Sequence, residues 1–229
     1  MSAMMIPQIA LPAILPVFPL TGVLLLPGTV LPLHIFEPRY RNMVEDALKG
    51  DRIFGMIQPV APQRDNRPPP GGAEKEQTDL YKIGCAGYIE SWERLLDDRF
   101  FVQLKGVNRF RSVDELPLQR GYRRVNADYG EFSDATTGEW ICERKAILRA
   151  LATFGQAHGM EVKPEQAKGF SDLELVNLLA VSLPFHPAEK QALLEAPTIK
   201  DREDTLLNLL RLGTEPGDPD SGTSPRTLN

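Results

Sequence analysis

The sequence is poor in the residues that build covalent or metal-based frameworks. It has only two cysteines, Cys85 and Cys142, and three histidines in 229 residues. The cysteines lie far apart and outside any paired spacing, so we expect reduced thiols rather than a disulfide framework or a zinc knuckle. His34, His158 and His186 have no partner at a metal-ligand spacing, so structural roles are expected for all three. The sequence therefore predicts no metal site and no cofactor.

Long apolar runs and a strong charge excess are also missing. No stretch approaches the roughly 20 uninterrupted apolar residues that cross a bilayer. No Lys or Arg precedes Arg39, so the charged start of a secretory signal is absent. The net charge of −5 is not that of a protein that binds polyanions through its overall charge. These features predict a cytoplasmic protein that makes no membrane contact.

Apolar residues and prolines are abundant in the stretch 15–59, around which the chain is organised. Prolines at positions 16, 19, 27 and 32 are too closely spaced for a helix, because each ring removes an N–H donor and clashes with the preceding turn. Short strands and tight turns are expected there. From Phe36 onward the apolar residues recur with helical period, and Pro38 and Gly50 suit the start and the stop of a helix. A further strand is expected at 52–58.

The middle of the chain predicts a loop and then a hairpin. Residues 59–78 are rich in Pro and Gly and have almost no large apolar side chain, which is typical of a long, mobile loop. Residues 79–115 read as two strands, with a turn between Leu95 and Arg99. Three glycines predict bulges or bends that curl the sheet toward a barrel: Gly84, Gly87 and Gly106. A last strand is expected within 122–132.

The remainder of the chain is helical in pattern. One helix is expected over 138–156, with Trp140 on its inner stripe. Ser171 and Glu174 form an S-x-x-E capping box in front of an apolar run. Further helices are expected after Pro187 and after a Thr198 cap.

Three segments follow one another in an order that points to a known family. The first is PVFPLTGVLLLPGTVLPLHIFEPRYRNMVEDAL with FGMIQP, the second is DLYKIGCAGYIE with VQLKGVNRFR, and the third is SDLELVNLLAVSLPFHPAEKQALLEAPTIKDREDTLLNLL. In this order they resemble the N-terminal, substrate-binding domain of the ATP-dependent Lon protease family. The resemblance covers about residues 14–212. It implies a role in binding other proteins, unfolded or as partners.

The resemblance and the patterns together predict an α+β fold, with a PUA-like curled sheet or pseudo-barrel followed by an α-helical bundle. The expected division is a flexible lead-in at 1–13, the β subdomain at 14–135, the helical subdomain at 138–212, and a disordered tail at 213–229. We expect a monomer or a weak homodimer.

Catalytic motifs of the Lon family are missing from these residues. An ATPase of that family needs a phosphate cradle of the form G-x-x-x-x-G-K-[ST], and no Gly-Lys dipeptide occurs in the sequence. The Ser-Lys peptidase of the family is a separate domain that the resemblance does not reach. No enzymatic activity is therefore expected.

The proline-broken apolar surface is the candidate binding site. Its turns and strand ends carry more large apolar side chains than a short β-segment can bury on one face: Leu24, Leu25, Leu26, Leu31, Phe36 and Tyr40. Exposed apolar patches tend to bind other chains, although each of these residues could equally fill an interface with the helical half. We expect Phe36, Glu37 and Arg39 to contact a bound polypeptide, together with Leu31 and Tyr40.

A cluster of arginines suggests RNA binding as an alternative function. Arg109, Arg111, Arg123 and Arg124 lie in and after the predicted hairpin, and PUA-like folds include RNA binders. The favoured interpretation is a solvated face balanced by nearby acidic residues, because the net charge is negative and stacking aromatics are not evident near the cluster. Nucleic acid is therefore not the expected partner.

Overall fold

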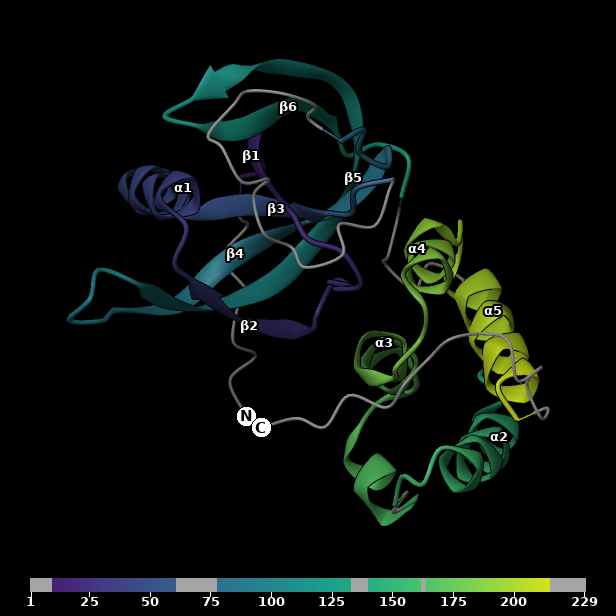
Figure 1. Cartoon of the computed structure of the whole chain (residues 1–229). Helices are drawn as coiled ribbons and strands as arrows, with labels where there is room; N and C mark the ends of the chain where they lie inside the picture. The colour runs from purple at the N-terminus through teal and green to yellow at the C-terminus, as the bar shows by residue number, and fades with distance from the viewer. Residues whose placement is uncertain (1–9, 61–77, 133–139, 162–163, 215–229) are drawn as a thin grey trace, which may run out of the picture.

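The computed structural model describes residues 10–60, 78–132, 140–161 and 164–214. The β elements and the helix between them are β1 (Ile14–Pro19), β2 (Val30–Ile35), α1 (Pro38–Lys49), β3 (Ile53–Ile57), β4 (Ile83–Arg94), β5 (Phe100–Gln119) and β6 (Tyr122–Asp128). The helical elements that follow are α2 (Arg144–Ala157), a 3-10 turn (Pro164–Gly169), α3 (Asp172–Ser182), α4 (Pro187–Glu195) and α5 (Ile199–Leu212). Figure 1 shows the strands and α1 on one side of the molecule and the remaining helices on the other.

The strands close into a small barrel. β1 pairs in parallel with β3 and antiparallel with β6. The pairs β3–β4, β4–β5 and β5–β6 are all antiparallel and complete the ring. β5 can serve two neighbours on one edge because it is 20 residues long: its first part pairs with β2 and its last part with β6. The predicted pseudo-barrel is confirmed, with β2 as an added edge strand.

The inside of the barrel holds its own apolar cluster. Leu15 and Val17 of β1 point inward and pack with Phe110 of β5 in this cluster. Gly55 faces the Phe110 ring so closely that an added Cβ would lie 2.7 Å from it. Arg109, the neighbour of Phe110, points the opposite way toward the helices, as side-chain alternation along a strand requires.

The glycine bends are confirmed in part. The register between β4 and β5 shifts at Ala86/Gly87, where the partner changes from Asn108 to Gly106. This bulge reverses which face the following residues of β5 present, and it bends the strand toward closure. No register shift occurs at Gly84, where the absent side chain instead leaves room for the ring of Phe110.

The apolar turn before β2 is buried, so the prediction that it displays its leucines is wrong. Leu24, Leu25 and Leu26 are at most 2% exposed and belong to the larger core, which the barrel shares with the helices. The side-chain amide of Asn177 in α3 donates to the carbonyl of Pro27 at 3.1 Å. The turn is therefore part of the joint between the two halves.

Helix starts follow the sequence signals, with one exception. The capping box of Ser171 and Glu174 begins α3, and Thr198 caps α5. α2 begins at Arg144 and not near residue 138. Trp140 lies before the helix, and its indole N–H donates to the buried carboxylate of Glu203 at 2.9 Å. That contact ties the segment before α2 to α5, which periodicity alone does not reveal.

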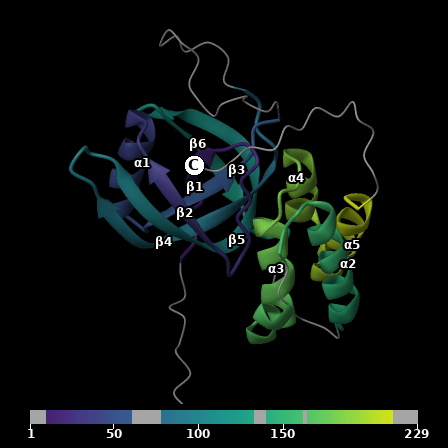
Figure 2. The ribbon, with the colours of Figure 1, turned by 60° about the horizontal axis from the view of Figure 1, so that its bottom comes forward.

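Polar contacts join the barrel to the helical half, and Figure 2 shows the two halves side by side from a second direction. The guanidinium of Arg109 donates to the carbonyls of Leu194 and Ala196 at 2.8 and 2.6 Å, at the end of α4. The side chain of Gln58, just after β3, donates to that of Gln191 in α4 at 3.1 Å. Because these groups are buried and satisfied together, they hold the halves in one orientation.

Several predicted segments lie outside the described residues. They are most of the lead-in, the centre of the 59–78 loop, the expected boundary near residue 136, and the tail from residue 215. At the base of the loop Pro59 bridges to Leu80. Among the helices of the described part, none has both the length and the apolar character of a membrane span.

Candidate functional site

The junction between β2 and α1 exposes one large aromatic side chain. Ile35, the last residue of β2, is 1% exposed, whereas Phe36 is 59% exposed. Because side chains alternate along a strand, the side chain of Phe36 points outward. Pro38 begins α1 two residues later, and its ring restricts its own φ to a value that a helix accepts. The ring of Phe36 is thus presented to solvent from a short, well-defined connection.

The two charged residues beside Phe36 pair with each other. Arg39 Nε donates to Glu37 Oε2 at 3.0 Å. The Arg39 guanidinium also lies 4.6 Å from the centre of the Tyr40 ring, a cation–π contact. Glu37 occupies the N-cap position of α1, but its side chain makes no capping bond there. Glu37 and Arg39 therefore form a fixed polar border next to Phe36.

Tyr40 is buried, which contradicts the expectation that it contacts a partner directly, whereas Leu31 is half-buried and its expected contact stays a prediction. Tyr40 is 5% exposed and packs against Phe18, with ring centres 4.2 Å apart. Burial raises the pKa of Tyr40 to about 12, so the phenol stays neutral. Leu31 is half-buried and packs against the larger core. The Tyr40 ring packs under the Arg39 guanidinium, and Tyr40 is not part of the accessible surface.

β2 is a sheet edge, and its proline limits what can bind there. The amide of Gly106 donates to the carbonyl of Thr29 at 2.8 Å, and the register then places Leu31 in a hydrogen-bonding position toward β5. By alternation, the backbone nitrogen of Pro32 faces the free edge, where it has no hydrogen to donate. Addition of a peptide strand is therefore disfavoured at the middle of this edge.

The hairpin between β4 and β5 adds an apolar feature that the sequence reasoning missed. Leu96, in its loop, is fully exposed, and Trp92 is 46% exposed. Ile35 is in register with Phe100, so Phe36 follows the strand toward the end of this loop, near Arg99. Ion pairs such as that of Arg94 with Glu45 of α1, at 3.6 Å, hold the hairpin against the helix. The signal in the sequence was the pair Leu95 and Leu96 at the start of a turn that is otherwise polar.

The arginine cluster is mostly engaged in internal contacts. Arg109 is fully buried and bonds to main-chain carbonyls, so it cannot meet a phosphate in this fold. Arg111 pairs with Glu131, and their hydrogen bond lowers the pKa of that carboxyl group. Arg123 pairs with Glu115 at 2.5 Å. The reading of these three residues as an RNA-binding groove is therefore not supported by their positions.

Arg124, the fourth residue of the cluster, is different. Its Nη2 donates to the carbonyl of Pro117 at 3.0 Å, and its side chain lines a pocket beside α1.

The histidines and cysteines have structural surroundings. His158 stacks on Phe154 at 4.0 Å between ring centres, and His186 caps the start of α4. Burial, followed by the nearby Glu203, raises the pKa of the Cys142 thiol to about 12. Within residues 10–60, 78–132, 140–161 and 164–214, no group of three or more His, Cys, Asp or Glu is arranged to hold a metal ion.

The fold is that of a Lon N-terminal domain, in which a small β-barrel precedes a helical part. A Lon N-terminal domain protein from Xanthomonas campestris superposes with a TM-score of 0.58 at 22% identity, over 86% of this chain and 96% of the other. The N-terminal domain of the Mycobacterium avium complex Lon protease gives a TM-score of 0.52 at 18% identity, over 89% and 98%. At these identities the likeness concerns the fold alone.

Sequence comparison then supplies the family. The model of the ATP-dependent protease La (LON) substrate-binding domain matches residues 14–211, and the chain belongs to this family. Lon protease 2 of Myxococcus xanthus is 29% identical over 211 residues, and the Lon protease of Anaeromyxobacter dehalogenans is 25% identical over 211. Both matches cover 87% of this chain but only 24% and 23% of those relatives. The chain thus spans about a quarter of their length.

Proposed function

We propose that this chain is a non-catalytic module that binds unfolded or partner proteins and acts as an adaptor or modulator of proteolysis. The observation that carries the proposal is Phe36, a large apolar ring exposed on a rigid connection. Membership of the substrate-binding domain family supports it. In the same proposal the protein works in the cytoplasm, as a monomer or weak homodimer, without catalysis of its own.

The surroundings of Phe36 suit the capture of an apolar segment. Rigid aromatic anchors contribute contact area at little entropic cost, and such residues dominate many interfaces. The Glu37–Arg39 pair supplies a polar border whose charges are already balanced, so a bound segment need not supply a counter-charge. Leu96, fully exposed on the β4–β5 hairpin, is a further apolar side chain available to a partner. This arrangement favours apolar side chains with little selection for sequence.

Binding to a permanently unfolded protein tests the proposal. Fluorescence anisotropy with a labelled, reduced and carboxymethylated polypeptide should show saturable binding to the wild-type chain. Phe36→Ser should weaken it about fivefold or more, the loss expected for a central anchor. Ile141→Ser, at another highly exposed apolar residue on the helical half, is the matched control and should leave binding unchanged. Absent binding, or equal losses in both variants, would contradict the proposal.

A further inference from the structure

The side of the sheet that carries Phe36 continues along β2 and across β5 to β4. Because side chains alternate along a strand, Pro32 and His34 share the side of Phe36, and all three are exposed, whereas the residues between them are buried. Gln103 of β5 and Ser91 of β4, which are in register with Pro32 on this side, are exposed as well. This three-stranded end points away from α2 to α5 in Figure 1. We call its accessible surface the open face.

Aromatic rings gather at one end of the open face. His34 and Phe101 are directly opposite each other in the β2–β5 register, and their ring centres lie 4.9 Å apart. Phe36 follows His34 by two residues, which separates their Cα atoms by roughly 7 Å in an extended chain. We call these three side chains the aromatic row. Aromatic side chains offer a large contact area and have few rotatable bonds, so covering them costs little entropy.

Glu93 of β4 lies at the end of the aromatic row. It is in register with Phe101, and residues that are directly opposite in antiparallel strands share a face, with Cβ atoms about 5 Å apart. The Glu93 side chain is exposed and has no ion pair or hydrogen bond with another of the described residues. A carboxylate in this position attracts a positive charge that a bound chain brings next to the rings.

The other charged side chains around the open face have partners of their own. Glu90 pairs with Lys105 at 3.4 Å. In the hairpin loop, Asp98 pairs with Arg94 at 2.9 Å, and the ion pair beside Phe36 is balanced in the same way. A positively charged side chain can therefore approach Glu93 without breaking an ion pair of the described part of the chain.

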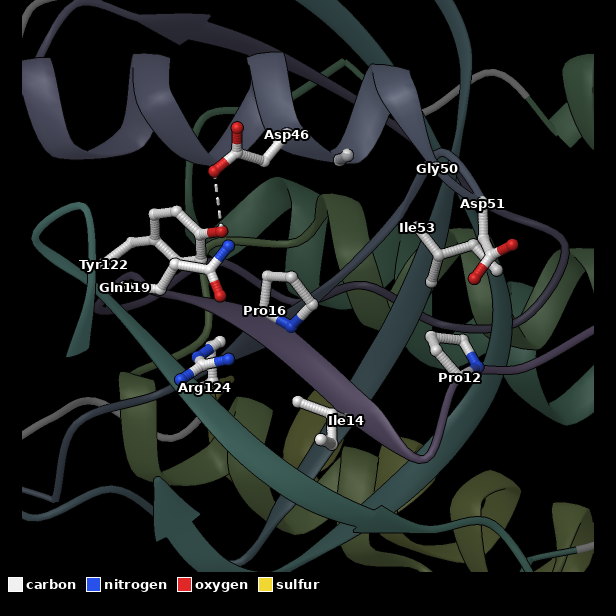
Figure 3. A pocket seen from close by; sticks show the side chains of 11 residues that line it. Pro12, Ile14, Pro16, Asp46, Gly50, Asp51, Ile53, Gln119, Tyr122 and Arg124 are labelled. Carbon is white, nitrogen blue, oxygen red and sulfur yellow. Dashed lines mark hydrogen bonds between the residues drawn. The ribbon is translucent and has the colours of Figure 1, made fainter. Parts of the chain in front are cut away.

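The pocket beside the C-terminal end of α1, drawn in Figure 3, has mixed charge instead. Its Asp46 accepts a hydrogen bond from Tyr122 at 3.0 Å and pairs with Arg120 at 2.6 Å. Asp51 and Arg124 lie on opposite sides of the same pocket. Its charges therefore favour neither a cation nor an anion.

We propose that the open face prefers polypeptide segments in which an apolar residue and a Lys or Arg are two positions apart. The apolar side chain covers the aromatic row, and the positive charge lies at Glu93. The inference rests on the proposed function, because it states which polypeptides the surface around Phe36 prefers. Phe36 by itself selects only apolar character, and Glu93 adds a selection for charge.

The spacing follows from the geometry of strands. Side chains two residues apart in an extended segment point to the same side and are about 7 Å apart, while neighbouring strands are about 4.8 Å apart. A segment that crosses β5 and β4 with an apolar side chain over Phe101 therefore places its next side chain on that side near Glu93. The long stem of Lys or Arg spans the remaining difference.

A pair of peptides that differ in one charge tests the inference. Both are short, labelled and rich in Gly and Ser, with one central Phe, and they carry either Lys or Glu two positions from it. By fluorescence anisotropy the wild-type chain should bind the Lys peptide about three to five times more tightly, the effect of one exposed ion pair. High salt should reduce this ratio.

Variants at exposed positions then assign the preference to Glu93. Glu93→Gln should abolish it and Glu93→Lys should reverse it, whereas Glu143→Lys, the same change of charge at an exposed position of the helical half, should preserve it. His34→Ser should weaken both peptides and leave their ratio unchanged.

Two kinds of result would contradict the inference, and they can be told apart. Equal affinity for the two peptides, or a preference that survives in Glu93→Lys, would overturn the selection for charge while binding of unfolded protein at Phe36 stands. Failure to bind the peptides by a chain that binds unfolded protein would overturn it as well. Failure to bind the peptides and unfolded protein alike would contradict the proposed function and the inference with it.

Discussion

Buried arginines act at the scale of single residues as ties between the parts of this protein. Arg109 reaches from β5 to the main-chain carbonyls at the end of α4, and Phe132 lies under its guanidinium at 4.0 Å. Arg202 donates to the Leu193 carbonyl at 3.1 Å and to Asn177 at 2.8 Å. Since arginine remains charged even when buried, such contacts must be nearly complete to be tolerated. Because a side chain such as Arg109 points into the protein, arginines that are close together in the sequence do not form a basic surface patch.

Arg109→Met should be strongly destabilising. The substitution keeps an apolar stem but leaves the carbonyls of Leu194 and Ala196 without their donor, so we expect a loss of about 3 kcal/mol in the free energy of unfolding. Urea denaturation measures it. Arg111→Met, at the surface, is the control and should shift the midpoint little. A similar small shift for both variants would show that the tie contributes little.

Asp46 should make the free energy of unfolding depend on pH in the acid range. Burial raises its pKa, but the hydrogen bonds from Tyr122 and Arg120 outweigh that effect, so the pKa lies below the ordinary value of 3.8. The unfolded chain therefore takes up this proton first as the pH falls. The stabilisation is complete above about pH 4 to 5 and is lost as the pH falls through the lowered pKa.

Asp46→Asn should thus be less stable at neutral pH and should show a flatter fall in stability between about pH 5 and pH 3. Tyr122→Phe, which removes one of the three side-chain donors to Asp46, should give an intermediate slope. Thermal unfolding followed at several pH values measures both. An unchanged slope in Asp46→Asn would refute this assignment.

At the scale of elements, the barrel closes because β5 is long and bent and because glycines make room for large rings. The bulge at Ala86/Gly87 turns β5 so that its last part can pair with β6. Gly55 and Gly84 both leave space for Phe110, which fills the inside of the ring. A narrow barrel needs such pairs of small and large residues for its interior to pack without voids.

Gly55→Ala should therefore be destabilising without any backbone strain. The new methyl group would lie 2.7 Å from the Phe110 ring and 2.8 Å from Leu15, so we expect a cost of about 1 to 3 kcal/mol. Adding Phe110→Leu should cost less in the Gly55→Ala background than in the wild type. A double-mutant cycle by urea denaturation measures the coupling. Strict additivity would mean that the two residues do not compete for space.

Sequence patterns foretold most elements but not how the elements share surfaces. Caps such as Ser171 and turn positions such as Leu95 to Arg99 act locally, and the structure confirms them. The burial of Leu24 and the burial of Arg109 against α4 depend on contacts with helices at least 85 residues away, which no local pattern contains. At the candidate site the exposure of Phe36 agrees with its position after a strand, whereas the burial of Tyr40 depends on Phe18.

At the scale of the whole molecule, the barrel and the helices share one core. The larger cluster contains strand residues such as Met56 and Phe100 together with helix residues such as Val176 and Leu206. The residues that join the halves are buried and bonded to one another. Neither half can therefore unfold without exposing apolar surface of the other, which favours a single cooperative transition.

The two tryptophans allow this expectation to be measured. Trp92 lies in β4 and Trp140 precedes α2, so Trp140→Phe and Trp92→Phe each leave one fluorescent reporter in a different half. In urea, each remaining tryptophan should report the same midpoint as far-UV circular dichroism does for that variant. Midpoints that differ between fluorescence and circular dichroism within one variant would show that the halves unfold separately.

The central claim is that the surface at the start of α1 contacts bound polypeptides, and site-specific crosslinking tests it most directly. A photoreactive benzoylphenylalanine in place of Phe36, or in place of Ile141 as the control, is irradiated with a labelled unfolded protein. The account predicts a crosslinked product from position 36, competed away by unlabelled polypeptide, and little product from position 141. Equal crosslinking at both positions, or product at 141 alone, would contradict it.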